Sequence, residues 1–170
     1  MAKESLLKTN CGNKVKSESE RKIDNWLYRN GWISIYEPSL KIHKGKVVNP
    51  DWVLLPQNGI TKPVIIEYWG LSVLKPNAAH WAKQVQPKYE AKRKKKELFY
   101  NNTPDYHYIG LTMPDLTDLD SILGVALDFL IIVRCPNFVE QAGHIILLHR
   151  YFLCILPKLF FLFGISNLNN

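Results

Sequence analysis

The sequence predicts an α/β domain with the order αβββαβ around a central mixed sheet. The chain has 170 residues, of which 46% are hydrophobic, enough to bury a core. Two short apolar runs, residues 47–55 and 64–69, are separated by the turn-forming segment Pro56 to Gly59. Segments with helix signals lie on both sides of these runs. A crossover helix would bring the fourth strand beside the first three.

The first helix has a clear start and a clear end. Ser17 is an N-cap residue, and Glu20 three positions later completes a capping box. Gly31 is suited to the position just after the helix. Glu20 lies three residues before Ile23 and seven before Leu27, so it shares their inward face. Glu20 is therefore a candidate for the functional site as well as a capping residue.

Three strands follow the first helix, over residues 32–40, 47–55 and 64–69. Asp51 lies near the start of the second strand and Glu67 near the end of the third. In an antiparallel hairpin the start of one strand lies beside the end of the next. We therefore expect Asp51 and Glu67 to lie together at one end of the sheet.

Two crowded carboxylates repel each other unless a metal ion or a shared proton compensates their charge. Carboxylate oxygens with open positions beside them suit Mg²⁺ or Mn²⁺. The pair Asp51 and Glu67 thus predicts a divalent metal site. The structural alternative for each residue is a carboxylate paired with a neighbouring cation.

The second half of the pattern is a helix and a strand. Residues 71–86 show few periodic signals and are predicted to be irregular. Pro87 suits the first turn of a helix that continues to Tyr100. The fourth strand is expected over residues 106–111. Residues 113–123 are expected to open with a turn and continue as a short acidic helix.

The chain divides into three parts. Residues 1–16 are polar and contain lysines, which predicts a mobile basic arm. Residues 17–123 carry the αβββαβ pattern. Residues 124–170 are strongly apolar, and the run 145–165 is close to the length that spans a membrane. Charged residues and Pro157 interrupt this run, so we weigh a spanning segment against a helix that covers the sheet and a non-native extension.

Charge and cysteine usage restrict the setting. The formal net charge is +7, with much of the excess in residues 88–96, which fits a polyanionic partner or a merely soluble basic protein. The three cysteines have no spacing typical of a zinc site or a disulfide framework. The first residues are too polar for a signal peptide. We expect a cytoplasmic, intracellular protein.

These features together resemble the PD-(D/E)xK nuclease superfamily, which includes type II restriction enzymes and Holliday-junction resolvases. The matching residues are Ser17 and Glu20, Pro50 and Asp51, Ile66 and Glu67, Trp69 and Gly70, and Tyr89, Lys96 and Tyr100. The resemblance implies a restriction-endonuclease-like fold and a Mg²⁺-dependent endonuclease. Asp51 and Glu67 would bind the metal, and Glu20 would bind a second metal directly or through water.

One position departs from the family. The lysine usually found two residues after the glutamate is replaced by Trp69. Some branches carry the lysine on the following helix instead. Tyr89, Lys96 and Tyr100 share one face of that helix, so Lys96 is the expected substitute and Lys92 the second choice. The lysine would orient the attacking water or stabilise charge on the phosphate.

The same helix is the expected nucleic-acid surface. The predicted contact residues are Lys92, Arg93, Lys94, Lys95, Tyr89 and Tyr100. The alternative is a solvated lysine face with aromatic side chains in the core. The expected partner is double-stranded or branched DNA, with RNA not excluded and a homodimer as one option. Two other functions stay open: an inactive nucleic-acid-binding module on the same fold, and a small membrane-associated protein, although a membrane is the less favoured partner.

Overall fold

The computed structural model describes residues 6–42 and 45–132. Its centre is a four-strand mixed sheet in the order β3 (Ser34–Tyr36), β6 (Trp52–Leu54), β7 (Val64–Trp69) and β8 (His107–Thr112). β3, β6 and β7 pair antiparallel, whereas β7 and β8 pair parallel. The parallel pair is joined through α2 (His80–Asn101). The predicted α/β class with a mixed sheet is confirmed.

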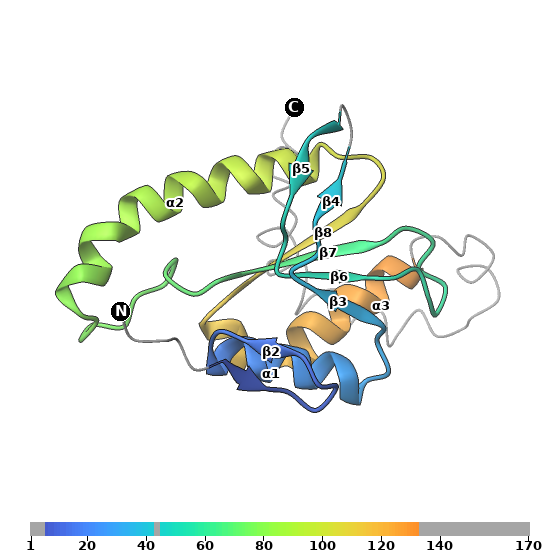
Figure 1. Ribbon diagram of the computed structural model, residues 1–170, viewed down its shortest axis with the longest axis horizontal. Helices are drawn as coiled ribbons and strands as arrows, with labels where there is room; N and C mark the ends of the chain where they lie inside the picture. Colours follow the sequence, from blue (N-terminus) through green and yellow to red (C-terminus); the bar gives the residue numbers. More distant parts are fainter. Residues whose placement is uncertain (1–5, 43–44, 133–170) are drawn as a thin grey trace, which may run out of the picture.

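Helices cover both faces of this sheet (Figure 1). α1 (Glu18–Arg29) and α3 (Val125–Ile132) lie on one face, and α2 lies on the other. Two short turns, η2 (Pro114–Thr117) and η3 (Asp120–Gly124), lead from β8 into α3. The segment predicted to open with a turn and continue as a short acidic helix thus consists of a 3₁₀ turn and a π-helical turn that precede α3.

The strands alternate between two cores, as the pleat of a sheet requires. Trp52 and Leu54 of β6 point to the α1 and α3 side, where the larger core lies. Val53 between them joins a smaller core with Ile65 and Tyr100 under α2. Each strand of the central pair is therefore buried on both faces, which explains why its sequence is almost continuously apolar.

The start of α1 is close to the prediction. The Ser17 hydroxyl accepts a hydrogen bond from the Glu20 backbone N–H at 3.2 Å. The Glu20 carboxylate bonds the backbone N–H of Lys16 at 2.7 Å, one residue earlier than in a standard capping box. Gly31, with a φ of +72°, follows the helix and takes the left-handed conformation that glycine tolerates.

Two of the predicted strands are each broken in two. A small hairpin, β4 (Leu40–Lys41) with β5 (Val47–Val48), is separated from β3 and β6. Pro38 and Pro50 lie at the two breaks, and proline has no N–H for the ladder. The hairpin rises off the sheet beside the last turns of α2 (Figure 1).

α2 begins earlier than predicted. It starts at His80, so Pro87 lies inside the helix rather than in its first turn. The Pro87 side chain is exposed, where the missing N–H costs least. The Gln86 side chain beside it bonds the Ser72 carbonyl at 3.1 Å and fixes the loop before the helix. The segment predicted to be irregular is thus helical from His80 onward.

Residues before α1 also differ from the prediction of a mobile arm. β1 (Leu7–Lys8) and β2 (Lys14–Val15) form a hairpin beside α1, and Val15 is fully buried. The buried carboxylate of Asp24 on α1 binds the hairpin turn, accepting from Cys11 Sγ at 2.9 Å and from Asn13 Nδ2 at 3.1 Å. It also accepts from the indole of Trp52 at 2.9 Å. One side chain therefore connects the hairpin, α1 and β6.

The described residues contain no helix both long and apolar enough to cross a membrane. The apolar run 145–165 lies outside the described residues.

Asp24 generates a prediction on stability. Burial alone would raise the pKa of Asp24, but bonds from Cys11, Thr9, Trp52 and Asn13 hold it below its ordinary value. We expect Asp24→Ala to lower the free energy of unfolding by about 3 kcal/mol, because it leaves buried donors without a partner. Urea unfolding at pH 7 measures this change.

The pH dependence follows from the same shift. A depressed pKa in the folded state stabilises the protein above the ordinary aspartate range, and this contribution is lost as the pH falls below about 4. Asp105→Ala, at an exposed position, is the matched control and should change stability by less than about 0.5 kcal/mol. Equal losses for the two variants would contradict the role of Asp24.

Candidate functional site

Asp51 and Glu67 lie at the same end of the sheet, as predicted from the sequence. Trp52 pairs with Ile66 in the antiparallel ladder between β6 and β7. Asp51 is the residue before Trp52, and Glu67 is the residue after Ile66. The register therefore places the two carboxylates on neighbouring strands, next to each other.

Glu67 is buried and satisfied from α2. Its side chain is 3% exposed. The carboxylate oxygen Oε1 accepts from Lys96 Nζ at 2.6 Å and from Tyr100 Oη at 2.8 Å. Lys96 and Tyr100 are four residues apart and so share one helix face. The lysine expected from the following helix therefore does reach the carboxylates.

The Lys96 side chain crosses an aromatic surface to reach Glu67. Its ammonium lies 5.6 Å from the centre of the Trp69 ring and 5.9 Å from that of Tyr100. Both rings are buried. The lysine stem is thus held along apolar surface while the charged end meets the carboxylate.

The surroundings of the Asp51 carboxylate oppose its ionisation. Its Oδ2 accepts from the Tyr68 backbone N–H at 2.7 Å. Burial, and then the charge of Glu67, raise the pKa of Asp51 to about 7, although the Tyr68 bond and the charge of Lys96 act in the other direction. Burial is therefore the main reason that Asp51 resists ionisation, and the charge of Glu67 is the second.

Glu20 is the third carboxylate of the neighbourhood. Its Oε2 accepts from the Tyr36 hydroxyl at 3.0 Å, in addition to the Lys16 N–H. The charge of Glu20 also raises the pKa of Asp51, though less than burial and Glu67 do. Lys16 itself forms an ion pair with Glu37, which follows β3. The Glu20 carboxylate is thus hydrogen-bonded to Tyr36 of β3 and to the Lys16 backbone N–H.

The candidate nucleic-acid residues of α2 fall into separate groups. Lys92, Lys94 and Lys95 are exposed. Arg93 is bound to Glu97 at 2.8 Å and lies 3.9 Å from Glu90. The exposed lysines remain candidates for phosphate contacts, whereas Arg93 has acidic partners on its own helix.

The two tyrosines predicted to contact nucleic acid pack against the protein. Tyr100 is 1% exposed and stacks on Tyr108 with ring centres 5.2 Å apart, so it has no free face for a base. Tyr89 packs edge-on against Trp69, and burial raises the pKa of Tyr89 to about 12. The alternative of core packing is correct for Tyr100. Its role at the site is to donate a hydrogen bond to Glu67.

Sequence reasoning missed two hydroxyl groups that connect α1 to the sheet. Tyr36 on β3 holds Glu20, and Ser19 accepts from the Tyr68 hydroxyl at 3.0 Å. Tyr36 pairs with Trp52, the residue after Asp51. The pairing of the first two strands could therefore have placed Tyr36 near Asp51. Nothing in the sequence distinguished Ser19 from other helix residues.

The chemistry of the site fits a hard divalent cation. The described residues contain no group of three His, Cys, Asp or Glu side chains arranged to hold a metal ion. Asp51 and Glu67 nevertheless offer carboxylate oxygens at adjacent positions, and the pKa of Asp51 is raised. Burial is the larger cause of that raised pKa and the charge of Glu67 the second. On their placement alone, Asp51 and Glu67 are the residues that would hold a cation.

The pKa of Asp51 generates a prediction for the metal-free protein. Its value in the folded state, about 7, lies above the ordinary 3.8, so folding takes up a proton between these values. Stability is therefore lost as the pH rises from about 4 to 7. We expect Asp51→Asn to remove this loss and to exceed the wild type by about 1–3 kcal/mol at pH 8 in EDTA.

Urea unfolding at pH 4.5 and pH 8 measures the difference. Asp128→Asn, at an exposed position on α3, is the control and should follow the wild type. A wild-type protein that is more stable than Asp51→Asn at pH 8 without metal would contradict the electrostatic description.

Comparisons of the chain with protein-family models, with curated proteins and with solved structures found no match in any of the three.

Proposed function

We propose that the chain is a Mg²⁺-dependent endonuclease that hydrolyses phosphodiester bonds of DNA, on a restriction-endonuclease-like core. The order of elements supports the proposal, because α1, the antiparallel strands β3, β6 and β7, then α2 and the parallel strand β8 follow the αβββαβ pattern. Mn²⁺ is the expected substitute metal.

The contact between Glu67 and Lys96 carries the proposal. The family resemblance requires an ammonium beside the acidic pair, and Trp69 occupies its usual position. Lys96 Nζ lies 2.6 Å from the Glu67 carboxylate although the two residues are far apart in the sequence. Lys96 of α2 would thus take the place of the lysine that Trp69 replaces.

Each residue then has a defined task. A bound divalent cation would polarise the phosphate and lower the pKa of a water. Asp51 and Glu67, on adjacent strands at the sheet end, would hold this cation. Lys96 would orient the attacking water or stabilise charge on the phosphate. Tyr100 keeps Glu67 in place while Lys96 is engaged.

The exposed lysines of α2 provide affinity for the DNA backbone. Lys92, Lys94 and Lys95 project into solvent from the same helix that carries Lys96. Contacts between lysines and phosphates release counterions, so binding should weaken as salt increases. α2 would therefore bind the DNA backbone through its exposed lysines and also contribute Lys96 to the chemical step.

A catalytically inactive DNA-binding module is the second candidate. One observation favours it: the Lys96 ammonium is already paired with Glu67, and Tyr100 satisfies the same oxygen. A carboxylate neutralised in this way resembles a structural ion pair. The two candidates differ only in whether DNA is cut when a divalent cation is present.

Cleavage of plasmid and branched DNA with Mg²⁺ and with EDTA tests the proposal. We expect metal-dependent cleavage by the wild type. Lys96→Met keeps most of the side-chain length and removes the charge, so single-turnover cleavage should fall on the order of a hundredfold or more. DNA affinity measured in Ca²⁺ should change little, because the exposed lysines are intact.

Lys92→Met is the matched control, since it removes an equal charge one helical turn away. It should weaken DNA binding modestly and leave the single-turnover rate near that of the wild type. Circular dichroism establishes that both variants are folded. Equal rates for Lys96→Met and the wild type would exclude Lys96 as the catalytic residue, and binding without any cleavage would favour the inactive module.

A further inference from the structure

A mainly apolar cavity of about 600 Å³ opens at the first two turns of α1. It lies between the first turn of α1, the loop that follows β7 and the segment that follows β8. Its apolar lining consists of Val73, Leu74, Pro76, Met113, Pro114 and Leu116. A volume in this range is typical of sites for small organic groups.

The cavity is connected to the candidate site through α1. Ser19 lines the cavity and is the residue before Glu20. The Ser19 hydroxyl accepts a hydrogen bond from Tyr68 Oη at 3.0 Å, and the Tyr68 backbone N–H binds Asp51. Tyr68 therefore links the wall of the cavity to Asp51 at the carboxylate end of the sheet.

The charges of the cavity match a phosphorylated ligand. Lys22 and Lys75 are exposed and line it. Its one carboxylate, Glu18, is engaged by Arg21 at 2.7 Å. An apolar interior with two lysines at its edge suits the faces of an aromatic ring attached to a phosphate.

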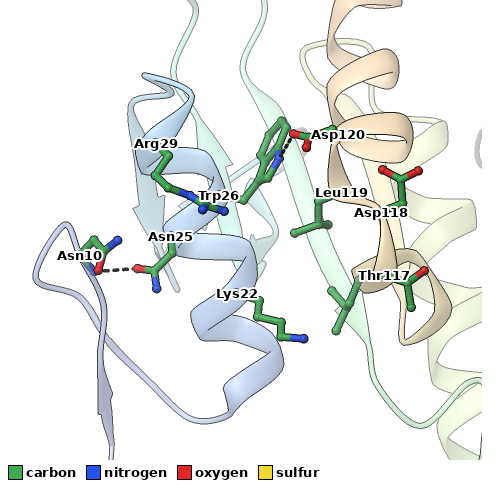
Figure 2. Close-up of a pocket in the computed structure, with 10 residues that line it drawn as sticks. Asn10, Lys22, Asn25, Trp26, Arg29, Thr117, Asp118, Leu119 and Asp120 are labelled. Carbon is green, nitrogen blue, oxygen red and sulfur yellow. Dashed lines mark hydrogen bonds between the residues drawn. The ribbon is translucent and has the colours of Figure 1, made fainter.

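A second hollow of about 400 Å³ has Lys22, Leu116 and Thr117 in common with the first. Figure 2 shows Lys22 on α1 and Thr117 across the hollow from it. The far wall of this hollow carries Asp118 and Asp120, and Asp120 accepts from the Trp26 indole at 2.6 Å. Lys22 and Arg29 line the same hollow, so its charges are mixed. The apolar cavity, with two lysines and a carboxylate engaged by Arg21, is the better match to a phosphorylated ligand.

We propose that the apolar cavity is a subsite for one unstacked nucleobase of the DNA strand, with Lys22 and Lys75 on its phosphate. This inference rests on the proposed function and adds its substrate class, DNA with an unpaired base beside the cut bond. Extruding a base costs a few kcal/mol, least where the base is already unpaired. Branched, gapped or single-stranded DNA is therefore preferred over intact duplex.

Fluorescence of 2-aminopurine tests the subsite without cleavage. The probe is a duplex carrying one unpaired 2-aminopurine, compared with the same duplex fully paired, in EDTA. Stacking quenches this base, and the cavity lining contains no aromatic side chain. We expect a several-fold rise in fluorescence when the wild type binds the unpaired probe, and at least tenfold tighter binding of that probe than of the paired one.

Val73→Glu places a carboxylate in the lining at a position that is 45% exposed, so the fold should tolerate it. It should abolish the fluorescence rise and the preference for the unpaired probe. Val47→Glu, which makes the same change at the 57% exposed Val47 on β5, is the control and should behave as the wild type.

The outcomes separate the subsite from the nuclease. A fluorescence rise that depends on Val73, without Mg²⁺-dependent cleavage, supports the subsite and refutes the nuclease. Cleavage of both duplexes at equal rates without a fluorescence rise retains the nuclease and overturns the subsite. Equal responses of Val73→Glu and Val47→Glu, or no binding of either probe, also overturn it.

Discussion

The arrangement of the site depends on one buried ion pair. Glu67 lies on a strand covered on both faces, where an isolated carboxylate is costly. Lys96 and Tyr100 make that position tolerable by converging on the same oxygen. Removing one partner of such a pair is expensive because the other is left buried and uncompensated. The contact therefore fixes where α2 lies over the sheet, and with it the position of the exposed lysines.

Burial and neighbouring charges both act on Asp51. The charges of Glu67 and Glu20 raise its pKa, and the charge of Lys96 lowers it. Lys16, paired with Glu37, also interacts with Glu20 and Asp51. The pKa of Asp51 is about 7, with burial as the largest cause and Glu67 as the second. A divalent cation would relieve both effects. The proposed metal site and the raised pKa of Asp51 thus both follow from the placement of Asp51 beside Glu67.

The features predicted from the sequence were those set by short-range patterns. The alternation of apolar residues and the turn at Pro56 to Gly59 were sufficient to place Asp51 beside Glu67. Helical spacing was sufficient to put Lys96 and Tyr100 on one face. Both inferences require only the periods of strands and helices, together with the rule for antiparallel neighbours.

Features that depend on contacts between distant residues were missed. The hairpin before α1 looks like a polar arm in sequence, and it is held by the buried Asp24 carboxylate and by the buried Val15 side chain. The breaks at Pro38 and Pro50 follow from the missing proline N–H. Tyr100 was predicted to contact nucleic acid, with core packing as the alternative, because an aromatic side chain on a basic helix has no sequence mark that tells a buried ring from an exposed one.

Calorimetric titration of Mg²⁺ at pH 6, in buffers of different ionisation enthalpy, tests the central claim that Asp51 and Glu67 await a cation. At this pH Asp51 is mostly protonated, so metal binding must displace its proton. We expect the wild type to bind Mg²⁺ with release of close to one proton, and both Asp51→Asn and Glu67→Gln to lose this binding. No binding at millimolar Mg²⁺, or binding that both variants retain without proton release, would contradict this claim.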